Sequence, residues 1–309
     1  MAIDSHALRQ AGKLFKKTVP GPRITVKAAR ANYDALLGTV MLPNNIDRQE
    51  VDVGPVMADL LIPELAMGKK TILYAHGGGF TAGSRFSARN LCSSIAHECA
   101  CRLLLPEYRL APEYPYPTAL EDLYNAYSWL LHQGVSASDV IFAGDGSGAN
   151  LAVSLVHFLR TRSVKLPSAV IAISPWINLA CDTASYLARK TGDPINSRES
   201  LLGQATLYTA EANFANPNVS PINGEFQGFP PLFVQCGSEE ILLDDAKRLA
   251  QKASNAGCPT VLDVHEGMWH LFQAIDSLTP EAQLAVKKIG KWVRDEMIEE
   301  RDGTAEASR

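Results

Sequence analysis

Short apolar runs that alternate with helical patterns are the feature that most constrains how this chain of 309 residues can fold. The runs cover residues 70–76, 101–109, 139–145, 168–176, 231–237 and 260–267. Continuously apolar strands separated by helices are typical of a parallel sheet that is covered on both faces, because each strand is then buried on both sides. The sequence therefore predicts an α/β fold with a mostly parallel central sheet and helices on both faces.

Helices are predicted between these strands and after the last one, over residues 117–134, 148–162, about 242–256 and about 280–300. The first of them carries the clearest boundary signals. Thr118, followed three residues later by Glu121, predicts a capping box at its start, and Gly134 predicts its end.

Two segments break this rhythm. Residues 1–45 precede the strands and have a partly helical pattern, and residues 181–222 form a long polar insertion that contains Pro194, Pro217 and Pro221. An insertion of that length is expected to be either a lid or a disordered segment. The chain length suits one α/β domain with an insertion, so we expect a single domain, 1–309, with a lid from about 1–45 and 181–222.

Charge and composition argue against several classes of partner. The formal net charge is −4 and no basic tract occurs, so no nucleic-acid partner is expected. No run of 18 apolar residues occurs and the N-terminus lacks the apolar core of a signal peptide, so we expect no transmembrane segment and a cytoplasmic protein. The six cysteines form no CxxC pair, which predicts buried free thiols and no metal site.

The stretch AGDGSGANLAV, residues 143–153, follows a predicted strand and opens a predicted helix. This is the setting of a nucleophile elbow, G-x-S-x-G, in which a sharp turn exposes a serine at the end of a sheet. Gly144 and Gly148 supply the two small positions, but Gly146 stands at the centre. Because glycine adopts a positive φ more readily than serine does, the elbow is expected to form without its hydroxyl.

A second motif, HGGGF, covers His76–Phe80 directly after a strand. Consecutive glycines at a strand end let backbone N–H groups turn toward a developing oxyanion. Such a turn is weak evidence alone, and gains weight only beside the elbow. His76 is expected to orient the glycine turn, and Asp145 to be a structural hydrogen-bonding group beside the elbow.

Together with EYRLAPEYPYPTALEDLYNAYSWL, NPNVSPI, GSEEILLDDA and GMWHLF, these motifs occur in the order seen in hormone-sensitive-lipase-like carboxylesterases. The chain resembles that family of α/β-hydrolases, also called bacterial family IV, over roughly residues 45–300. The resemblance implies hydrolysis of carboxylic esters, a helical lid, and no metal or organic cofactor. The family serine maps onto Gly146, the family acid onto Glu240 and the family histidine onto His270.

The resemblance also implies an oxyanion hole formed by the amides of Gly77, Gly78 and Ser147. Glu239 is an alternative to Glu240 as the acid. Phe80, Trp176, Met268 and Trp269 flank the motifs and are candidates for an acyl or alcohol pocket, although as single residues they fit a hydrophobic core equally well.

Three interpretations of Gly146 follow. The chain is a short-chain ester hydrolase scaffold that lacks its nucleophile and is nearly inactive, with a small, apolar ester as its ligand. Alternatively, it is a ligand-binding or receptor-like pseudo-hydrolase. In the third interpretation Ser147 is the nucleophile, although a shift of one residue at a helix start rotates the side chain by about 100°. The sequence leaves open whether the chain forms a homodimer.

Overall fold

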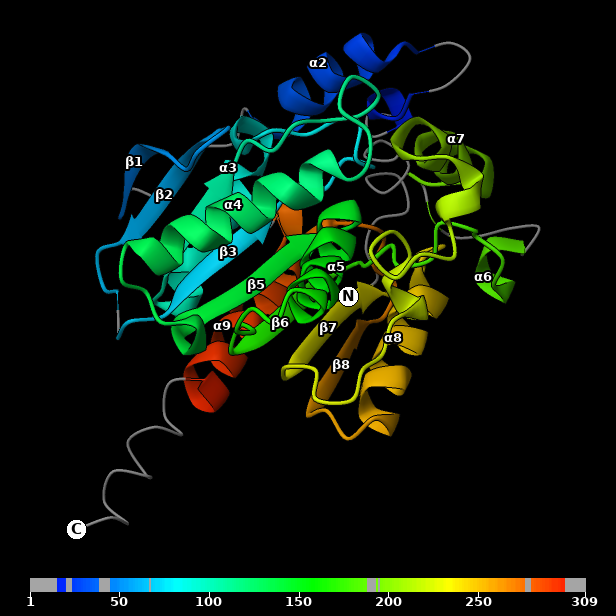
Figure 1. Ribbon diagram of the computed structural model, residues 1–309. Helices are drawn as coiled ribbons and strands as arrows, with labels where there is room; N and C mark the ends of the chain where they lie inside the picture. The colour runs from blue at the N-terminus through cyan, green and yellow to red at the C-terminus, as the bar shows by residue number, and fades with distance from the viewer. Residues whose placement is uncertain are drawn as a thin grey trace.

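The computed structural model describes residues 16–20, 24–38, 45–66, 68–187, 193, 195–275 and 279–297. An eight-stranded sheet with the order β1-β2-β4-β3-β5-β6-β7-β8 runs through its centre (Figure 1). The pairs β1–β2 and β2–β4 are antiparallel and all other pairs are parallel. The strands are Ile46–Asp52 (β1), Met57–Pro63 (β2), Thr71–Ala75 (β3), Arg102–Pro106 (β4), Val140–Asp145 (β5), Ala169–Ile173 (β6), Leu232–Gly237 (β7) and Thr260–His265 (β8).

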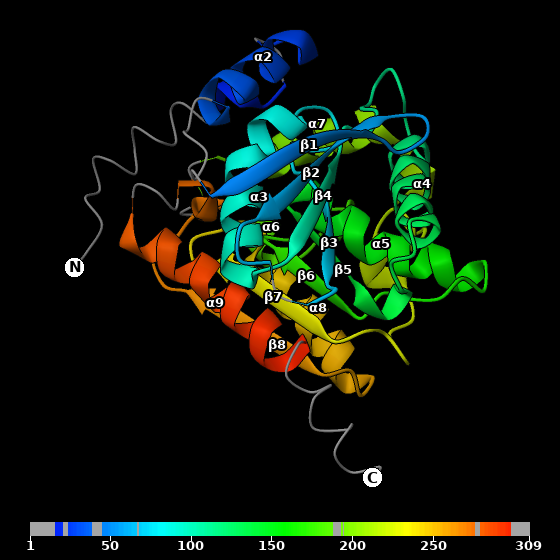
Figure 2. The same cartoon turned by 90° about the vertical axis from the view of Figure 1, so that its left-hand side faces the viewer.

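Helices cover both faces of this sheet. Helices α4, α5 and α8 lie on the face that points to the viewer in Figure 1, and α3 and α9 lie on the opposite face (Figure 2). The described α-helices are Val26–Leu37 (α2), Arg85–Cys99 (α3), Thr118–His132 (α4), Ser147–Thr161 (α5), Ala184–Leu187 (α6), Arg198–Tyr208 (α7), Leu243–Asn255 (α8) and Pro280–Met297 (α9). Short 3-10 helices are Lys16–Thr18 (η1), Ala137–Asp139 (η2), Glu211–Asn213 (η3), Pro221–Asn223 (η4) and Phe272–Ile275 (η5). None of the described helices is long and apolar enough to cross a membrane.

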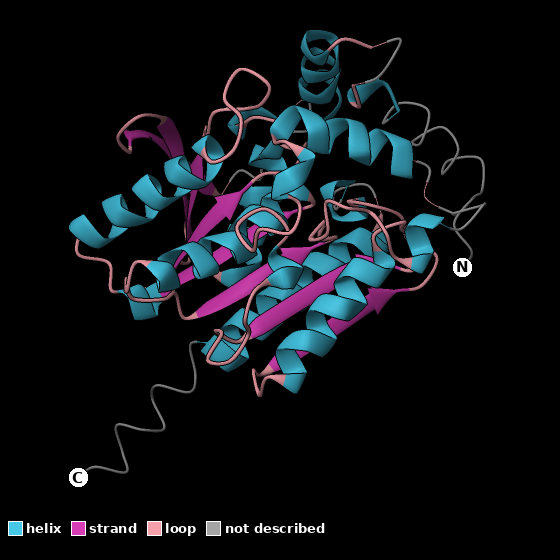
Figure 3. Cartoon of the chain, turned by 45° about the vertical axis from the view of Figure 1, so that its right-hand side comes forward, coloured by secondary structure: helices cyan, strands magenta, loops and turns pink. Residues whose placement is uncertain are grey.

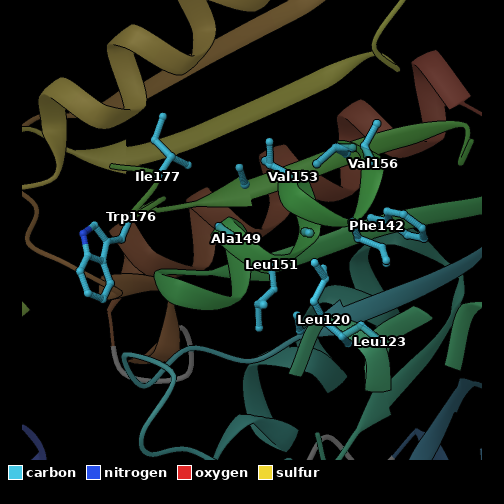
Figure 4. Packing of buried hydrophobic residues seen from close by; sticks show 14 of the residues in the cluster. Leu120, Leu123, Phe142, Ala149, Leu151, Val153, Val156, Trp176 and Ile177 are labelled. Carbon is cyan, nitrogen blue, oxygen red and sulfur yellow. The ribbon is translucent and has the colours of Figure 1, made fainter. Parts of the chain in front are cut away.

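The alternation of side chains along the central strands divides the core into two clusters. Phe142 of β5 packs with Leu120 and Leu123 of α4 and Leu151 of α5 (Figure 4). Its neighbour Ile141 points to the other face and belongs to the cluster under α3 and α9. Because both faces of β5 are covered, all of its residues are buried, which explains why its sequence is a continuous apolar run.

The α/β architecture and the predicted strands are confirmed, with boundaries that differ by a few residues. The antiparallel strands β1 and β2 have no counterpart among the predicted strands. At the edge of the sheet, β1, with the sequence IDRQEVD, is mostly exposed and lacks an apolar run. The capping box at Thr118 is wrong: the N-cap of α4 is Pro117, whose carbonyl accepts the N–H of Glu121. The cysteines are confirmed as buried free thiols.

The two segments expected to form a lid contribute helices on one side of the molecule. Helices α2 and α7 both lie on the side toward which the parallel strands run (Figure 3). Residues 1–15, 21–23, 39–44, 188–192 and 194 of these segments lie outside the described residues. The described part of the insertion is anchored to α8, because Asp244 accepts the N–H of Ser185 at 2.7 Å and Asp245 accepts the hydroxyl of Tyr186 at 2.8 Å.

Candidate active site

The parallel strands end at one edge of the sheet, and the predicted site residues follow these ends. The glycine turn follows β3, Gly146 follows β5, Ser174 follows β6, Glu240 comes after β7 and His270 after β8. In parallel sheets the carboxyl ends of the strands meet at the same edge, so residues far apart in the chain come together there.

The turn after β5 has the geometry of an elbow. Gly146 has φ 53° and ψ −115° and is the N-cap of α5. Its N–H donates to the carbonyl of Ile173 at 2.9 Å, and its own carbonyl accepts the N–H of Trp176 at 3.1 Å. A Cβ atom on Gly144 would collide with the backbone of Gly148, and one on Gly148 would collide with the end of β3. The tight approach of α5 to the sheet therefore requires glycine at both positions.

His270 faces this turn and is backed by a buried carboxylate. A Cβ atom placed on Gly146 would lie 3.4 Å from both Cε1 and Nε2 of His270, which is ordinary van der Waals contact. On the far side of the ring, Nδ1 lies 3.3 Å from Oε2 of Glu240. The other carboxylate oxygen of Glu240 accepts the N–H of Gly237 at 2.5 Å and the hydroxyl of Ser174 at 2.8 Å. Glu240, and not Glu239, therefore pairs with the histidine.

The electrostatics of the pair favour a protonated imidazole. Burial by itself lowers the pKa of His270, but the hydrogen bond and charge of Glu240 and the charges of Asp193 and Asp145 outweigh it, so the pKa is raised. Asp193 also accepts the N–H of Ile241 at 3.1 Å, next to Glu240. Burial raises the pKa of Asp193. The insertion is thus tied directly to the loop that carries the acid.

The glycine turn corrects one predicted oxyanion donor. The N–H of Gly77 donates to Oδ1 of Asp145 at 2.9 Å, so this amide is already engaged and is not available to an oxyanion. Gly78 and Gly79 instead line the pocket beside Gly146 and Ser147. No local motif reveals this bond, because its acceptor Asp145 ends β5, 68 residues further along the chain.

Two polar residues behind the turn hold it in place. Asp145 also accepts the hydroxyl of Tyr74 at 2.9 Å, and burial raises the pKa of its carboxyl. His76 stacks on Tyr108 with 4.2 Å between the ring centroids, and its Nδ1 lies 2.8 Å from the carbonyl of Gly77. Both side chains therefore contact the glycine turn itself, as their expected orienting and structural roles require.

Ser147 is buried at the start of α5, and its hydroxyl is committed to the glycine turn. Oγ accepts the N–H of Phe80 at 3.2 Å. Within the part of the chain that the structure describes, no hydrogen bond joins this hydroxyl to His270.

A pocket opens over Gly146 and His270, with about 510 Å³ of space between its atoms, part of it open to solvent. Trp176 lines it. Phe80 is buried behind the lining and stacks on Tyr208 of α7 at 3.9 Å between centroids. Met268 and Trp269 are buried in the hydrophobic cluster on the α3 and α9 face and do not line the pocket. The other lining residues are Thr18, Val19, Tyr33, Ile195, Asn196, Leu201, Gln204, Leu242 and Leu271.

Ser174 is a functional candidate that lies outside the predicted motifs. Besides donating to Glu240, its Oγ accepts the N–H of Leu271 at 3.3 Å, and so it holds both the acid and the backbone next to His270. One sequence signal indicates a role for Ser174: it directly follows a central strand, at the edge of the sheet where the site forms. Asp193, Asn196 and Gln204 carried no such signal, because they lie in an insertion without a recognisable motif.

The strand order, the elbow and the histidine–glutamate pair define an α/β-hydrolase. A family model described as alpha/beta hydrolase fold matches residues 72–274, and the chain belongs to this family. It is 38% identical to an acetyl-hydrolase of Streptomyces hygroscopicus over 79% of this chain and 81% of that protein. It is 36% identical to an esterase of Acinetobacter venetianus over 74% of this chain and 75% of that protein.

Solved structures agree with these relatives. The chain is similar to the crystal structure of an esterase from the bacterial hormone-sensitive lipase family, with a TM-score of 0.89 and 35% identity, covering 96% of this chain and all of that one. A crystal structure of an esterase/lipase from an uncultured bacterium is similar with a TM-score of 0.87 and 29% identity, over 94% of this chain and 98% of that one.

Proposed function

We propose that this chain is a carboxylic ester hydrolase scaffold for short-chain acyl esters whose nucleophile position holds glycine, so that it binds esters but turns them over very slowly. The observation that carries the proposal is the contact between the vacant Cβ position of Gly146 and His270, which in turn is backed by Glu240. A serine oxygen is one bond beyond Cβ and would come within hydrogen-bonding reach of Nε2. The esterase and acetyl-hydrolase names of the relatives support the same reaction class.

In the complete reaction, His270 takes the proton of the attacking hydroxyl and the resulting imidazolium is stabilised by Glu240. The amides of Gly78, Gly79 and Ser147 are the proposed donors to the oxyanion, since within the described residues these N–H groups donate to no other group. Without the hydroxyl no acyl-enzyme forms. Loss of a serine nucleophile elsewhere lowers kcat by about 10⁶-fold, and we expect a loss of that order here.

The test is hydrolysis of p-nitrophenyl acetate and p-nitrophenyl butyrate by this chain and by Gly146→Ser, side by side. The proposal predicts an increase of several orders of magnitude in the variant. Two folded proteins that are equally inactive would overturn it and would favour the receptor-like pseudo-hydrolase. The control is Ser147→Ala in the chain as written: if Ser147 were the nucleophile, this change would abolish an activity that is already present.

We further propose that the two segments over the pocket act as its lid. Thr18, Val19 and Tyr33 come from the N-terminal segment, and Ile195, Leu201 and Gln204 come from the insertion. These residues support the proposal because they contribute to the lining on the side away from the sheet. Removing residues 1–38 is expected to raise KM for the butyrate ester in Gly146→Ser more than it lowers kcat, and an unchanged KM would contradict the assignment.

A further inference from the structure

Helix α7 carries a side-chain amide, that of Gln204, on its buried face. Leu201, Gln204, Ala205 and Tyr208 form that face, at the spacing expected for one side of a helix. Gln204 is only 5% exposed and lines the pocket. Its amide lies directly against the glycine turn, because a Cβ atom placed on Gly79 would collide with it. No hydrogen bond to this amide is formed by any described residue.

A second residue of the same segment that carries an amide, Asn196, lines the same pocket. Asn196 lies just before Ser197, the N-cap of α7, and its backbone N–H is held by Asp193 at 3.0 Å. Its side-chain Nδ2 is buried and has no hydrogen-bond partner. Buried donors are nearly always paired in folded proteins, since an unpaired one loses its hydration without compensation. Two uncommitted amides in one pocket therefore point to a ligand that pairs with them.

The rest of the lining restricts what that ligand is. Among the described residues that line the pocket, His270 is the one ionisable side chain apart from Tyr33, and no carboxylate, lysine or arginine is present. Leu201, Leu242 and Ile195 supply apolar walls. An amide offers both a donor and an acceptor, which a hydroxyl group can satisfy together and a hydrocarbon cannot.

We propose that Asn196 and Gln204 form a specificity site for a hydroxyl group on the substrate, so that the chain recognises neutral, hydroxyl-bearing esters in preference to purely hydrocarbon ones. The inference deepens the proposed function and rests on it for the presence of the ester. It differs from the sequence-based expectation of an apolar substrate, which took no account of side chains in the insertion.

The test uses the chain as written, in which the absent nucleophile leaves the ester intact. Binding of methyl 3-hydroxybutanoate and of its hydrocarbon isostere, methyl 3-methylbutanoate, is followed by NMR titration. We expect the hydroxy ester to bind more tightly by roughly tenfold, which corresponds to the net contribution of one added hydrogen bond. Asn196→Leu and Gln204→Met should each reduce the preference, and together they should abolish it.

Gln251→Met, on the exposed side of α8, is the matched control and should keep the preference. If the Asn196→Leu variant does not fold, Asn196→Ala, which only removes atoms, replaces it in the binding test. Equal affinities for the two esters, no binding of either, or a preference that survives the double variant would overturn the inference. If Gly146→Ser proves inactive while the binding preference and its loss are observed, the proposed hydrolysis fails and the recognition site stands.

Discussion

Ser174→Ala should destabilise the fold well beyond an ordinary surface change. Ser174 is fully buried, and its hydroxyl makes two hydrogen bonds, to the Glu240 carboxylate at 2.8 Å and from the N–H of Leu271 at 3.3 Å. A hydrogen bond to a charged group contributes about 1.5–3 kcal/mol, and a buried N–H left without a partner costs about 1–3 kcal/mol. Since the second bond is long and Glu240 keeps the N–H of Gly237, we expect a loss of about 2–4 kcal/mol in total.

The assay is urea unfolding at pH 7, with Ser168→Ala as the matched control. Ser168 precedes the same strand at its other end and donates one neutral hydrogen bond, to the carbonyl of Val140 at 2.9 Å. Its removal should cost only about 0.5–1.5 kcal/mol. In the Gly146→Ser background, Ser174→Ala should also lower kcat/KM by at least roughly tenfold, because Glu240 loses a group that orients it. A Ser174→Ala variant no less stable than Ser168→Ala would refute this account of the residue.

Three further predictions concern ionisable groups. In Gly146→Ser, the midpoint of the acid limb of the kcat/KM profile should lie above about pH 6.5, because the raised pKa of His270 keeps the imidazole protonated and unable to act as a base. The ion pair of His270 with Glu240 stabilises the fold at low pH, and this stabilisation is lost as the pH rises through that pKa. Burial lowers the pKa of His157 to about 4, so between about pH 6.5 and 4 only the unfolded chain gains this proton. Stability should therefore drop by about 3 kcal/mol over that interval, and His157→Phe should remove this part of the drop in urea titrations at several pH values. Asp59 is fully buried against Arg48, Arg85 and Arg89, which are 19–39% exposed. Asp59→Asn should cost about 1–3 kcal/mol in the same assay, less than a fully buried pair, and Asp47→Asn on exposed β1 should cost almost nothing.

The fold could be predicted where burial of a strand on both faces requires a continuous apolar run in the sequence. β3, β5 and β7 are covered on both faces, so each appears as an apolar run, whereas β1 is an exposed edge strand and shows none. The sequence of helix α7 indicates only a polar insertion, because its buried face is short and contains Gln204. Periodicity detects which residues are buried, but a half-exposed element close to a pocket has little periodicity to detect.

The site could be predicted as far as its motifs extend. Gly146, Glu240 and His270 are adjacent in the structure because each follows a strand of known order. The role of Gly77 could not be predicted, because its amide donates to the carboxylate of Asp145 at the end of β5. The burial of Met268 and Trp269 in the hydrophobic cluster could not be predicted either, since a position beside a motif does not determine which way a side chain points.

The contacts that the insertion makes at the site also could not be predicted from the sequence. Asp193 bonds to the loop of the acid, and Asn196 carries the unpaired amide, yet neither residue lies in a recognisable pattern. Contacts of this kind depend on tertiary packing between segments, which local sequence rules do not encode.

The most direct test of the central claim is covalent labelling with a phosphonate that reacts with activated serines, followed by intact-mass measurement and peptide mapping. The account predicts one adduct per chain in Gly146→Ser, located at position 146, and none in the chain as written. An adduct on Ser147 of the chain as written, or a folded Gly146→Ser that stays unlabelled, would contradict the claim that this hydrolase scaffold lacks only its nucleophile.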